Sequence, residues 1–583
     1  MKETKFCALT TPYEAEMRKA DIPFAEYPRP MLQRDSYICL NGLWNFDIET
    51  QREVEHSDRI LVPFPPESRI SGVEVITQPE DVLVYRRSFT LPQGFRGGRW
   101  LLHFGAVDQV ATVKLNGQKL GEHEGGYLPF SFDITAALRE GENELEVTVI
   151  DPLDHDLPWG KQRYDRGGMW YTPVSGIWQT VWIENVPQDA VESLRVEQSL
   201  DTLRLNVFGG AEEKTLIIET PDGELTHTFT GSYTELSIPN PRNWSPDDPY
   251  LYHYTLRTGE DTVRSYFALR TVTIEEKNGA PVICLNGKPT FFHGLLDQGY
   301  FSDGIFLPAT EQGFRDDILR MKALGFNMLR KHIKLEPELF YYYCDLYGMV
   351  VFQDFINSGD YSFFYDTALP TAWIRRGLTH RVTRRRRKIF YATGEAIVKQ
   401  LYSHPCVCYY TIFNEGWGQF EADRVYDHFK AFDPSRVWDA TSGWFKHKRS
   451  DVESDHIYFK PVKLKAVKGR PMVLSEFGGY SLKLLEHSFN LDQTYGYRKY
   501  TDPAAFEQDL LALYRDEIIP TIGQGLCATV YTQVSDVEDE TNGLLTYDRA
   551  VCKVNEERMR EMAKSLYNAF AVKFAREGGS ENV

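Results

Sequence analysis

The sequence predicts a three-domain protein: a jelly-roll β-sandwich, an immunoglobulin-like β-sandwich and a (β/α)8 barrel, in that order along 583 residues. Two observations lead to this prediction. Short segments that alternate apolar and polar residues, the period of half-buried strands, fill the chain up to about residue 273. After that point apolar residues recur at helical spacing, and the helices alternate with short apolar strands. We therefore expect domains at residues 1–187, 188–273 and 274–583.

The first domain, residues 1–187, is predicted from short strands separated by turn residues. Ala111, Val113 and Leu115 alternate with polar neighbours. The pair Asn116-Gly117 follows and favours the positive backbone angles of a tight hairpin turn. Similar runs recur with Gly, Pro, Asp or Asn between them, and few helical patterns interrupt them. This pattern indicates an all-β sandwich or jelly roll.

The second domain, residues 188–273, repeats the alternation on a smaller scale. Leu203, Leu205 and Val207 point to one face, and a Pro221-Asp222-Gly223 turn follows the next strand. About seven short strands in this length are typical of an immunoglobulin-like sandwich. We expect Trp244, in a turn-rich segment, to cover one end of this sandwich.

The third domain, residues 274–583, has the period of helices. Phe314, Ile318 and Met321 lie on one helix face, and an apolar strand follows directly at 326–329. A second helix begins near Pro337 and ends at Gly348, and another apolar strand comes next. Strands buried on both faces that alternate with helices predict one (β/α)8 barrel, in which the chemistry lies at the C-terminal ends of the strands.

Composition excludes several classes of protein. The net charge of −18 argues against a general affinity for nucleic acid or anionic membrane. No apolar run approaches the roughly 18–20 residues of a membrane span, and the first seven residues contain no long apolar core of a signal peptide. Eight cysteines without a CxxC pair predict neither a disulfide framework nor a zinc site. We therefore expect a soluble, cytoplasmic protein with no cofactor.

Two glutamates follow predicted barrel strands. The strand at 408–413 runs into Asn414-Glu415, and the strand at 471–475 leads to Glu476. The 61 positions between the two leave room for two more strands, so the glutamates end strands four and seven and face each other across the barrel mouth. Glycosidic hydrolysis uses such a pair: carboxyl groups about 5–5.5 Å apart indicate retention of configuration, and about 6.5–9.5 Å indicates inversion. Either glutamate alone could be a structural partner of Arg or Lys, but the two together favour catalysis.

Several motifs resemble glycoside hydrolase family 2, which contains bacterial β-galactosidases, β-glucuronidases and β-mannosidases. The resemblance covers nearly the whole chain and its domain order. Leu40-Asn41-Gly42-Leu43-Trp44, Gly125-Gly126-Tyr127 and Ser175-Gly176-Ile177-Trp178 resemble the sugar-binding domain of the family. Trp244-Ser245-Pro246 through Tyr250-Leu251-Tyr252 resembles its immunoglobulin-like domain. Ser403-His404-Pro405 leading to Asn414-Glu415 resembles its acid/base signature, and Ser475-Glu476-Phe477-Gly478 is similar to its nucleophile segment.

The resemblance implies roles for four residues. Glu415 inherits the general acid/base role and Glu476 the nucleophile role, with retention of anomeric configuration. Asn414 would bond the 2-hydroxyl of the sugar, although it could also simply close the turn. Tyr458, at the end of the predicted sixth strand, matches the tyrosine that bonds the nucleophile, although a barrel tyrosine is often only packed.

Five further residues are candidate substrate contacts. His332 is similar to a substrate-facing histidine of the galactosidases. Asp354 resembles a β-mannosidase segment and could bind a sugar hydroxyl or pair with Arg330, and Asp297 could act similarly. Trp417 and Trp444 are candidates for stacking on a sugar, although an aromatic at a strand end is about as often part of the core.

Departures from the family pattern bear on the substrate and the metal. The galactosidase aspartate before the Met169-Trp170 pair is Gly168 here, which weakens a strict lactase prediction. The residues that grip a uronate carboxylate in glucuronidases are replaced by the acidic run 538–540, which should repel a uronate. The Glu-x-His magnesium ligands of the large galactosidases have no clear counterpart after Phe352. We therefore predict no required metal.

The sequence thus predicts a retaining exo-glycosidase that releases a terminal neutral sugar from a small glycoside or oligosaccharide, with a β-galactoside as first candidate. β-Mannosidase and a galactofuranosidase or arabinofuranosidase are the alternatives within the family. A catalytically inactive carbohydrate-binding protein is the alternative of another class. The sandwich domains offer surfaces for a homo-oligomer. The basic run at 384–388 is expected to form an exposed helix face.

Overall fold

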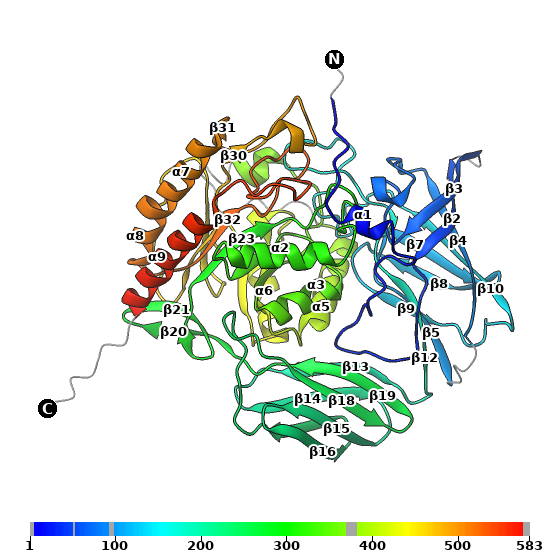
Figure 1. The fold of residues 1–583 in the computed structure, drawn as a ribbon. Coiled ribbons are helices and arrows are strands. Elements are labelled where there is room, and N and C mark those ends of the chain that lie inside the picture. Colours follow the sequence, from blue (N-terminus) through cyan, green and yellow to red (C-terminus); the bar gives the residue numbers. More distant parts are fainter. Residues whose placement is uncertain (1–4, 51–52, 93–97, 369–381, 575–583) are drawn as a thin grey trace.

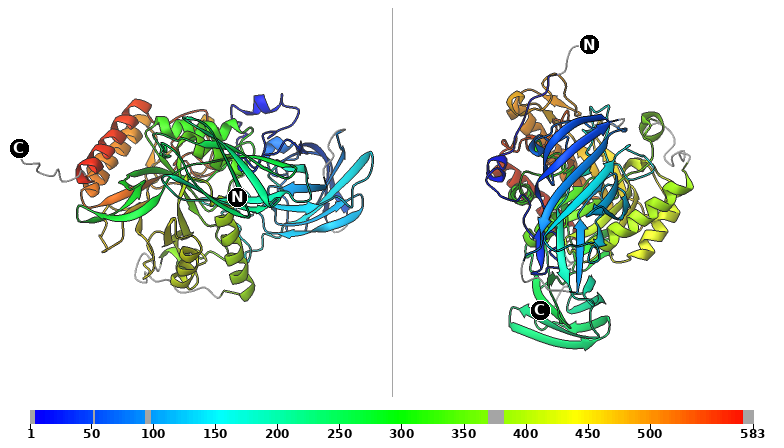
Figure 2. Two further views of the ribbon diagram at one scale, coloured as in Figure 1. Left: turned by 90° about the horizontal axis from the view of Figure 1, so that it is seen from below. Right: turned by 90° about the vertical axis from the view of Figure 1, so that its right-hand side faces the viewer.

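The computed structural model describes residues 5–50, 53–92, 98–368 and 382–574. It contains two β-sandwiches and a barrel in the predicted order, each with its own buried core (Figure 1). The immunoglobulin-like sandwich projects from the rest of the molecule, as the right-hand view of Figure 2 shows. No helix among the described residues is both long and apolar enough to cross a membrane.

The first sandwich consists of a six-stranded and a four-stranded antiparallel sheet. In spatial order, the larger sheet contains β3 (Glu53–Val62), β2 (Gly42–Thr50), β4 (Val82–Thr90), β10 (Glu142–Ile150), β7 (Val110–Leu115) and β8 (Gln118–Glu124). The smaller contains β1 (Tyr37–Cys39), β12 (Val181–Val186), β5 (Arg99–Phe104) and β9 (Phe130–Asp133). The predicted hairpin is confirmed: β7 pairs with β8, and Asn116 and Gly117 have φ of 54° and 81°.

The second sandwich consists of a three-stranded and a four-stranded sheet. The first contains β13 (Val191–Glu197), β14 (Thr202–Gly209) and β17 (Tyr233–Ser237); the second contains β16 (Gly223–Thr230), β15 (Glu213–Thr220), β18 (Tyr252–Thr258) and β19 (Asp261–Phe267). Trp244 does not merely cover this sandwich. It is completely buried, and its Nε1 donates to the carbonyl oxygen of Asp345 at 2.7 Å, so it packs against a barrel helix.

A small sheet leads into the barrel: β20 (Val272–Lys277), β21 (Ala280–Leu285) and β22 (Lys288–Pro289). Eight parallel strands then form a nearly closed barrel, whose end strands β27 and β28 lie beside each other without a shared ladder. Along the chain they are β23 (Phe292–Asp297), β24 (Met328–Lys331), β25 (Val350–Asp354), β26 (Val407–Phe413), β27 (Val437–Thr441), β28 (Glu453–Ile457), β29 (Met472–Gly478) and β32 (Leu526–Thr532).

Helices surround the barrel (Figure 1): α2 (Gln312–Ala323), α3 (Glu338–Tyr347), α5 (Arg384–Leu401), α6 (Ala422–Phe432), α7 (Pro503–Leu513), α8 (Ile519–Ile522) and α9 (Glu556–Phe574). The predicted helix from Pro337 to Gly348 is confirmed, since these residues are the two caps of α3. The described connections that follow β27 and β28 contain no helix, so the barrel lacks two helices of the ideal repeat.

The basic run at the start of α5 is not simply an exposed face. Arg386 is 4% exposed, and its Nη2 donates to the carbonyl oxygen of Ser358 at 2.8 Å. Arg385 pairs with Asp154 and Glu124 of the first sandwich, each at 2.6 Å. The run therefore anchors the helix to neighbouring parts of the same chain.

Candidate active site

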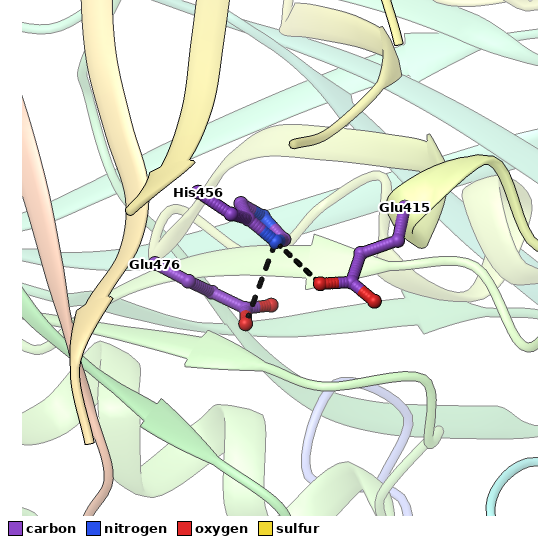
Figure 3. Close-up of side chains that lie close together, drawn as sticks. All are labelled: Glu415, His456 and Glu476. Carbon is purple, nitrogen blue, oxygen red and sulfur yellow. Dashed lines mark hydrogen bonds and ion pairs between the residues drawn. The ribbon is translucent and has the colours of Figure 1, made fainter. Parts of the chain in front are cut away.

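The two glutamates come together at the ends of the fourth and seventh barrel strands. Glu415 directly follows β26, and Glu476 lies near the end of β29. They are only 8% and 5% exposed. One oxygen of each carboxyl group and a ring nitrogen of His456 lie within 4.8 Å of one another (Figure 3).

The backbone at Glu415 leaves the strand through an unusual conformation. Its φ of 47° and ψ of 24° lie in the left-handed region, which costs a residue other than glycine about 1–3 kcal/mol. The Glu415 N–H donates to Ser442 Oγ at 3.2 Å and helps to hold this turn. The conformation directs the side chain towards His456 and Glu476, as Figure 3 shows.

His456, in β28, lies between the two carboxyl groups. Its Nδ1 is 2.9 Å from Glu415 Oε1 and 3.5 Å from Glu476 Oε2. Its Nε2 is 3.4 Å from Nη1 of Arg330, which can only donate. Nε2 therefore accepts, and Nδ1 carries the hydrogen that is donated to Glu415. Burial lowers the pKa of His456 to about 4, so the ring is neutral at pH 7.

Arg330, in β24, connects the residues of the site. It is 1% exposed, and it donates through Nη1 to Glu476 Oε1 at 2.9 Å and through Nη2 to Asn414 Oδ1 at 2.8 Å. Its Nε donates to Asp354 Oδ1 at 2.9 Å. Planar groups with several donors suit such a network, because each hydrogen bond fixes the orientation of one acceptor.

The two carboxyl groups have different electrostatic surroundings. Burial raises the pKa of Glu415 to about 7, and no Lys or Arg among the described residues forms an ion pair with it. Burial also raises the pKa of Glu476, but the Arg330 guanidinium opposes that shift, and Tyr458 donates its hydroxyl hydrogen to Glu476 Oε2. A fixed cation and a hydroxyl donor thus favour the ionised form of Glu476, whereas burial favours the protonated form of Glu415, which is the division between a base and an acid that glycosidic hydrolysis needs.

Comparisons with known proteins agree with this architecture. The profile described as the galactose-binding domain-like domain of glycosyl hydrolase 2 matches residues 71–172, that of glycosyl hydrolases family 2 matches 187–270, and the TIM barrel domain of that family matches 274–466. The chain belongs to glycosyl hydrolase family 2.

Two curated relatives illustrate the range of this family. A β-galactosidase of Thermoanaerobacter pseudethanolicus is 26% identical over 46% of this chain, which spans only 39% of the length of that protein. A β-glucuronidase of Felis catus is 26% identical over 70% of this chain and 69% of its own length. Among solved structures, a β-glucuronidase from an uncultured Clostridium has a TM-score of 0.72 at 18% identity, covering 92% of this chain and 99% of that one. A β-galacturonidase from Eisenbergiella tayi has a TM-score of 0.66 at 20% identity, covering 92% and 97%.

Three further residues named from the sequence contact members of the site in this family 2 protein. Asn414 accepts at Oδ1 from Arg330 and, at 3.0 Å, from Ser442, so its amide N–H group is the part that would donate to a sugar. Tyr458 stacks on Tyr497, with ring centroids 3.9 Å apart. Trp444 meets the ring of His456 edge-on at 5.8 Å.

The acidic residues predicted to contact substrate are held by protein groups. Asp354 is fully buried; Arg330 occupies its Oδ1, and His332 Nδ1 lies 2.8 Å from its Oδ2. Asp354 thus makes the pairing with Arg330 that was one of its two expected roles, and its contact with a sugar hydroxyl stays a prediction. Asp297 pairs with Lys331 at 2.6 Å and accepts from the N–H of Gly299 at 3.0 Å. Burial lowers the pKa of His332 to about 3, which leaves that ring neutral.

A segment of the first sandwich lies over the barrel mouth. Trp170 stacks between Trp159 at 5.4 Å and Trp417 at 5.3 Å, and these rings form one buried cluster. Trp417, named from the sequence as a sugar platform, is 2% exposed and packs within this cluster. The sequence offered core packing as the alternative role of Trp417, but it did not indicate the partner rings, because the contacts join two domains.

Lys161 lies in the same segment, and no motif in the sequence marks it as a site residue. It is 5% exposed, and its ammonium group lies over the rings of Tyr171 at 5.5 Å and Trp417 at 6.0 Å. It forms no ion pair with a carboxylate among the described residues. Burial raises the pKa of both Glu415 and Glu540, and the positive charge of Lys161 lies close enough to oppose that rise.

The acidic run that follows β32 turns towards protein groups. Glu538 pairs with Arg166 at 2.9 Å and accepts from the N–H of Thr172 at 2.9 Å. Asp539 accepts from Asn490 Nδ2 at 2.7 Å, and Glu540 accepts from Gln533 Nε2 at 2.6 Å. Each carboxylate thus has a donor of its own.

Glu415, His456 and Glu476 also have the spacing of a metal-ligand set. The chemistry of the set does not suit a divalent cation. The Nδ1 that faces the carboxylates carries a hydrogen, and the Arg330 guanidinium contacts both His456 and Glu476. A bound cation would need the other tautomer of His456 and would lie beside a fixed positive charge.

Proposed function

We propose that this family 2 protein is a retaining exo-glycosidase in which Glu476 is the nucleophile and Glu415 the general acid/base. The short separation of the two carboxyl groups carries the proposal. One oxygen of each group lies within 4.8 Å of the other, and this short approach favours the roughly 5–5.5 Å separation of retaining enzymes over the 6.5 Å or more of inverting ones. The segment of the first sandwich that carries Trp159 and Trp170 lies over the barrel mouth. A mouth covered in this way favours a substrate that enters by its chain end.

In the first step, the Glu476 carboxylate attacks the anomeric carbon while the bond to the leaving oxygen breaks. Glu415 gives its proton to that oxygen. Because Glu415 Oε1 accepts from His456, the acidic proton sits on Oε2. With a pKa of about 7, Glu415 is about half protonated at neutral pH. In the second step, the Glu415 carboxylate takes a proton from water, which attacks the anomeric carbon and releases Glu476.

Neighbouring side chains orient the reacting groups. Arg330 and Tyr458 hold the two oxygens of Glu476 and favour its ionised form. The amide N–H group of Asn414 is oriented by the donors at its Oδ1 and would donate to the sugar 2-hydroxyl. Hydrogen bonds to that hydroxyl strengthen in the transition state.

A β-galactoside is the first candidate substrate, as the sequence suggests, and a curated relative is named a β-galactosidase. β-Mannosides and β-linked furanosides are the alternatives among neutral sugars. Location in the cytoplasm and homo-oligomer formation stay predictions from the sequence.

A β-uronide is a second candidate, and Lys161 is the observation that favours it. A buried ammonium group without an ion-pair partner among the described residues is a natural receptor for a carboxylate. The acidic run 538–540, which the sequence predicts to repel a uronate, is bound to protein donors. Similar solved structures are named β-glucuronidase and β-galacturonidase.

A substrate panel tests both proposals. The protein is assayed with p-nitrophenyl β-galactoside, β-mannoside, β-glucuronide, β-galacturonide and the two furanosides, and NMR identifies the anomer formed first. We expect turnover with retention and a loss of several orders of magnitude in Glu476→Ala. Binding without turnover across the panel would instead support a carbohydrate-binding protein. If the substrate is a uronide, Lys161→Gln should lower kcat/KM at least about tenfold for it and change turnover of neutral glycosides little.

A further inference from the structure

A cavity of about 610 Å³ lies where the three domains meet. Its walls come from β5, β9 and β12 of the first sandwich, β13 and β14 of the second, and α3, α5 and α6 of the barrel. None of the candidate active-site residues lines it. The volume is that of a typical small-molecule site.

The walls are largely aromatic. Phe104 and Phe130 stack with ring centroids 4.8 Å apart on the side of the first sandwich. Phe208 of the second sandwich is 48% exposed although it is a large apolar side chain. Tyr402 and Phe432 contribute the barrel side. A ligand that covered the partly exposed rings of Phe130, Phe208 and Phe432 would remove apolar surface from water, which is favourable in proportion to the area buried.

The charges on the walls are mainly positive. Arg195 lies over the ring of Tyr402 at 3.9 Å, and Lys399 lies over Phe432 at 5.7 Å. Neither forms an ion pair with a described residue. Glu338 alone is acidic among the described lining residues, and burial raises its pKa.

Polar atoms in the walls also lack partners. Nε of Arg29, Nε of Arg195 and Nε2 of His103 are buried without a hydrogen bond in the described structure. His103 is 6% exposed, and burial lowers the pKa of its ring to about 3, so it is neutral. The two arginine nitrogens can only donate, and a small movement of either side chain would present a donor to a ligand that brings acceptors.

We propose that this three-domain cavity is a second binding site that takes an aromatic organic anion. The apolar body would lie against Phe130 and Phe208, and the carboxylate or sulfonate group would face Arg195 and Lys399. Because the walls belong to three domains, an occupant holds the two sandwiches against the barrel. The site is independent of the reaction proposed for Glu415 and Glu476.

The test uses the full chain and two probes that differ in charge. 8-Anilinonaphthalene-1-sulfonate is the anion, and N-phenyl-1-naphthylamine is its neutral counterpart. Fluorescence titration and calorimetry give the Kd and stoichiometry for wild type and for Arg195→Gln, Lys399→Gln and Phe208→Ser. Lys564→Gln removes an exposed positive charge on α9, away from the cavity, and is the matched control. Circular dichroism and glycosidase turnover report whether each variant is folded.

We expect one anion per chain. The Kd should rise at least about tenfold in Arg195→Gln and Lys399→Gln and stay unchanged in Lys564→Gln. Phe208→Ser should weaken the binding of both probes, and added salt should weaken only that of the anion. Equal affinity for the two probes, equal affinity of the cavity variants and Lys564→Gln, or no saturable binding would each overturn the proposal.

Discussion

Removal of the hydrogen bond between His456 and Glu415 should shift the pH dependence of the reaction. His456→Leu deletes the Nδ1–H donor, which lies 2.9 Å from Glu415 Oε1. A hydrogen bond to a charged group contributes about 1.5–3 kcal/mol, roughly twice one to a neutral group. The ionised form of Glu415 therefore loses about 1–1.5 kcal/mol more than the protonated form does. One pKa unit corresponds to 1.36 kcal/mol, so the pKa should change by about one unit.

The sign follows from which form is destabilised. The donor favours the carboxylate, and its removal raises the pKa of Glu415 from about 7 towards about 8. Because Glu415 must be protonated to act as the acid, the alkaline limb of kcat/KM should move to higher pH by about the same amount. The assay is the pH profile of kcat/KM on the best nitrophenyl glycoside of the panel, for wild type and variant.

His456→Asn is the matched control, since the asparagine amide can present an N–H group close to the position of Nδ1. Its alkaline limb should stay near that of wild type. If His456 only filled space, His456→Leu and His456→Asn would have the same pH profile. An unchanged limb in His456→Leu, or an equal shift in both variants, would refute the assignment of the hydrogen to Nδ1.

Three other changes have expected outcomes. Tyr458→Phe removes the hydroxyl that donates to Glu476; kcat should fall roughly ten- to a hundredfold, and the acid limb of the pH profile should move up because the Glu476 carboxylate loses a donor. Arg330→Met leaves Asp354 and Glu476 buried without their cation. The variant should lose about 3–5 kcal/mol of stability and unfold at a lower temperature in a fluorescence melt. An unchanged midpoint would contradict the role of the network. Trp170→Ala removes a ring stacked between Trp159 and Trp417; it should cost about 3–5 kcal/mol and raise KM, whereas an unchanged KM would show that the segment does not shape the substrate site.

Local pattern was a reliable guide to the individual elements. The hairpin at Asn116-Gly117 and the helix between Pro337 and Gly348 were predictable because the signals of each lie within one short segment of the chain. The helices absent after β27 and β28 were not foreseen, since the barrel prediction rested on a repeat that these two connections do not follow. Trp244 was assigned to one sandwich, but its partner is in α3, 101 positions away.

The site was predictable only where residues belong to a motif. Glu415 and Glu476 stand at strand ends followed by glycine or by an aromatic residue and glycine. His456 and Lys161 carry no motif, and their importance depends on what they face. Arg330 entered the prediction only as a partner of Asp354, whereas it also contacts Glu476 and Asn414.

The sequence alone determined the three domains and the position of two glutamates at barrel strand ends. Both follow from the order of alternating, turn and helical segments, and that order is a property of local sequence. Tertiary structure decided the electrostatics. The pKa of Glu415, the tautomer of His456 and the isolation of Lys161 depend on burial and on contacts within a few ångströms. Those contacts join strands and domains that are far apart in the chain, so no local pattern records them.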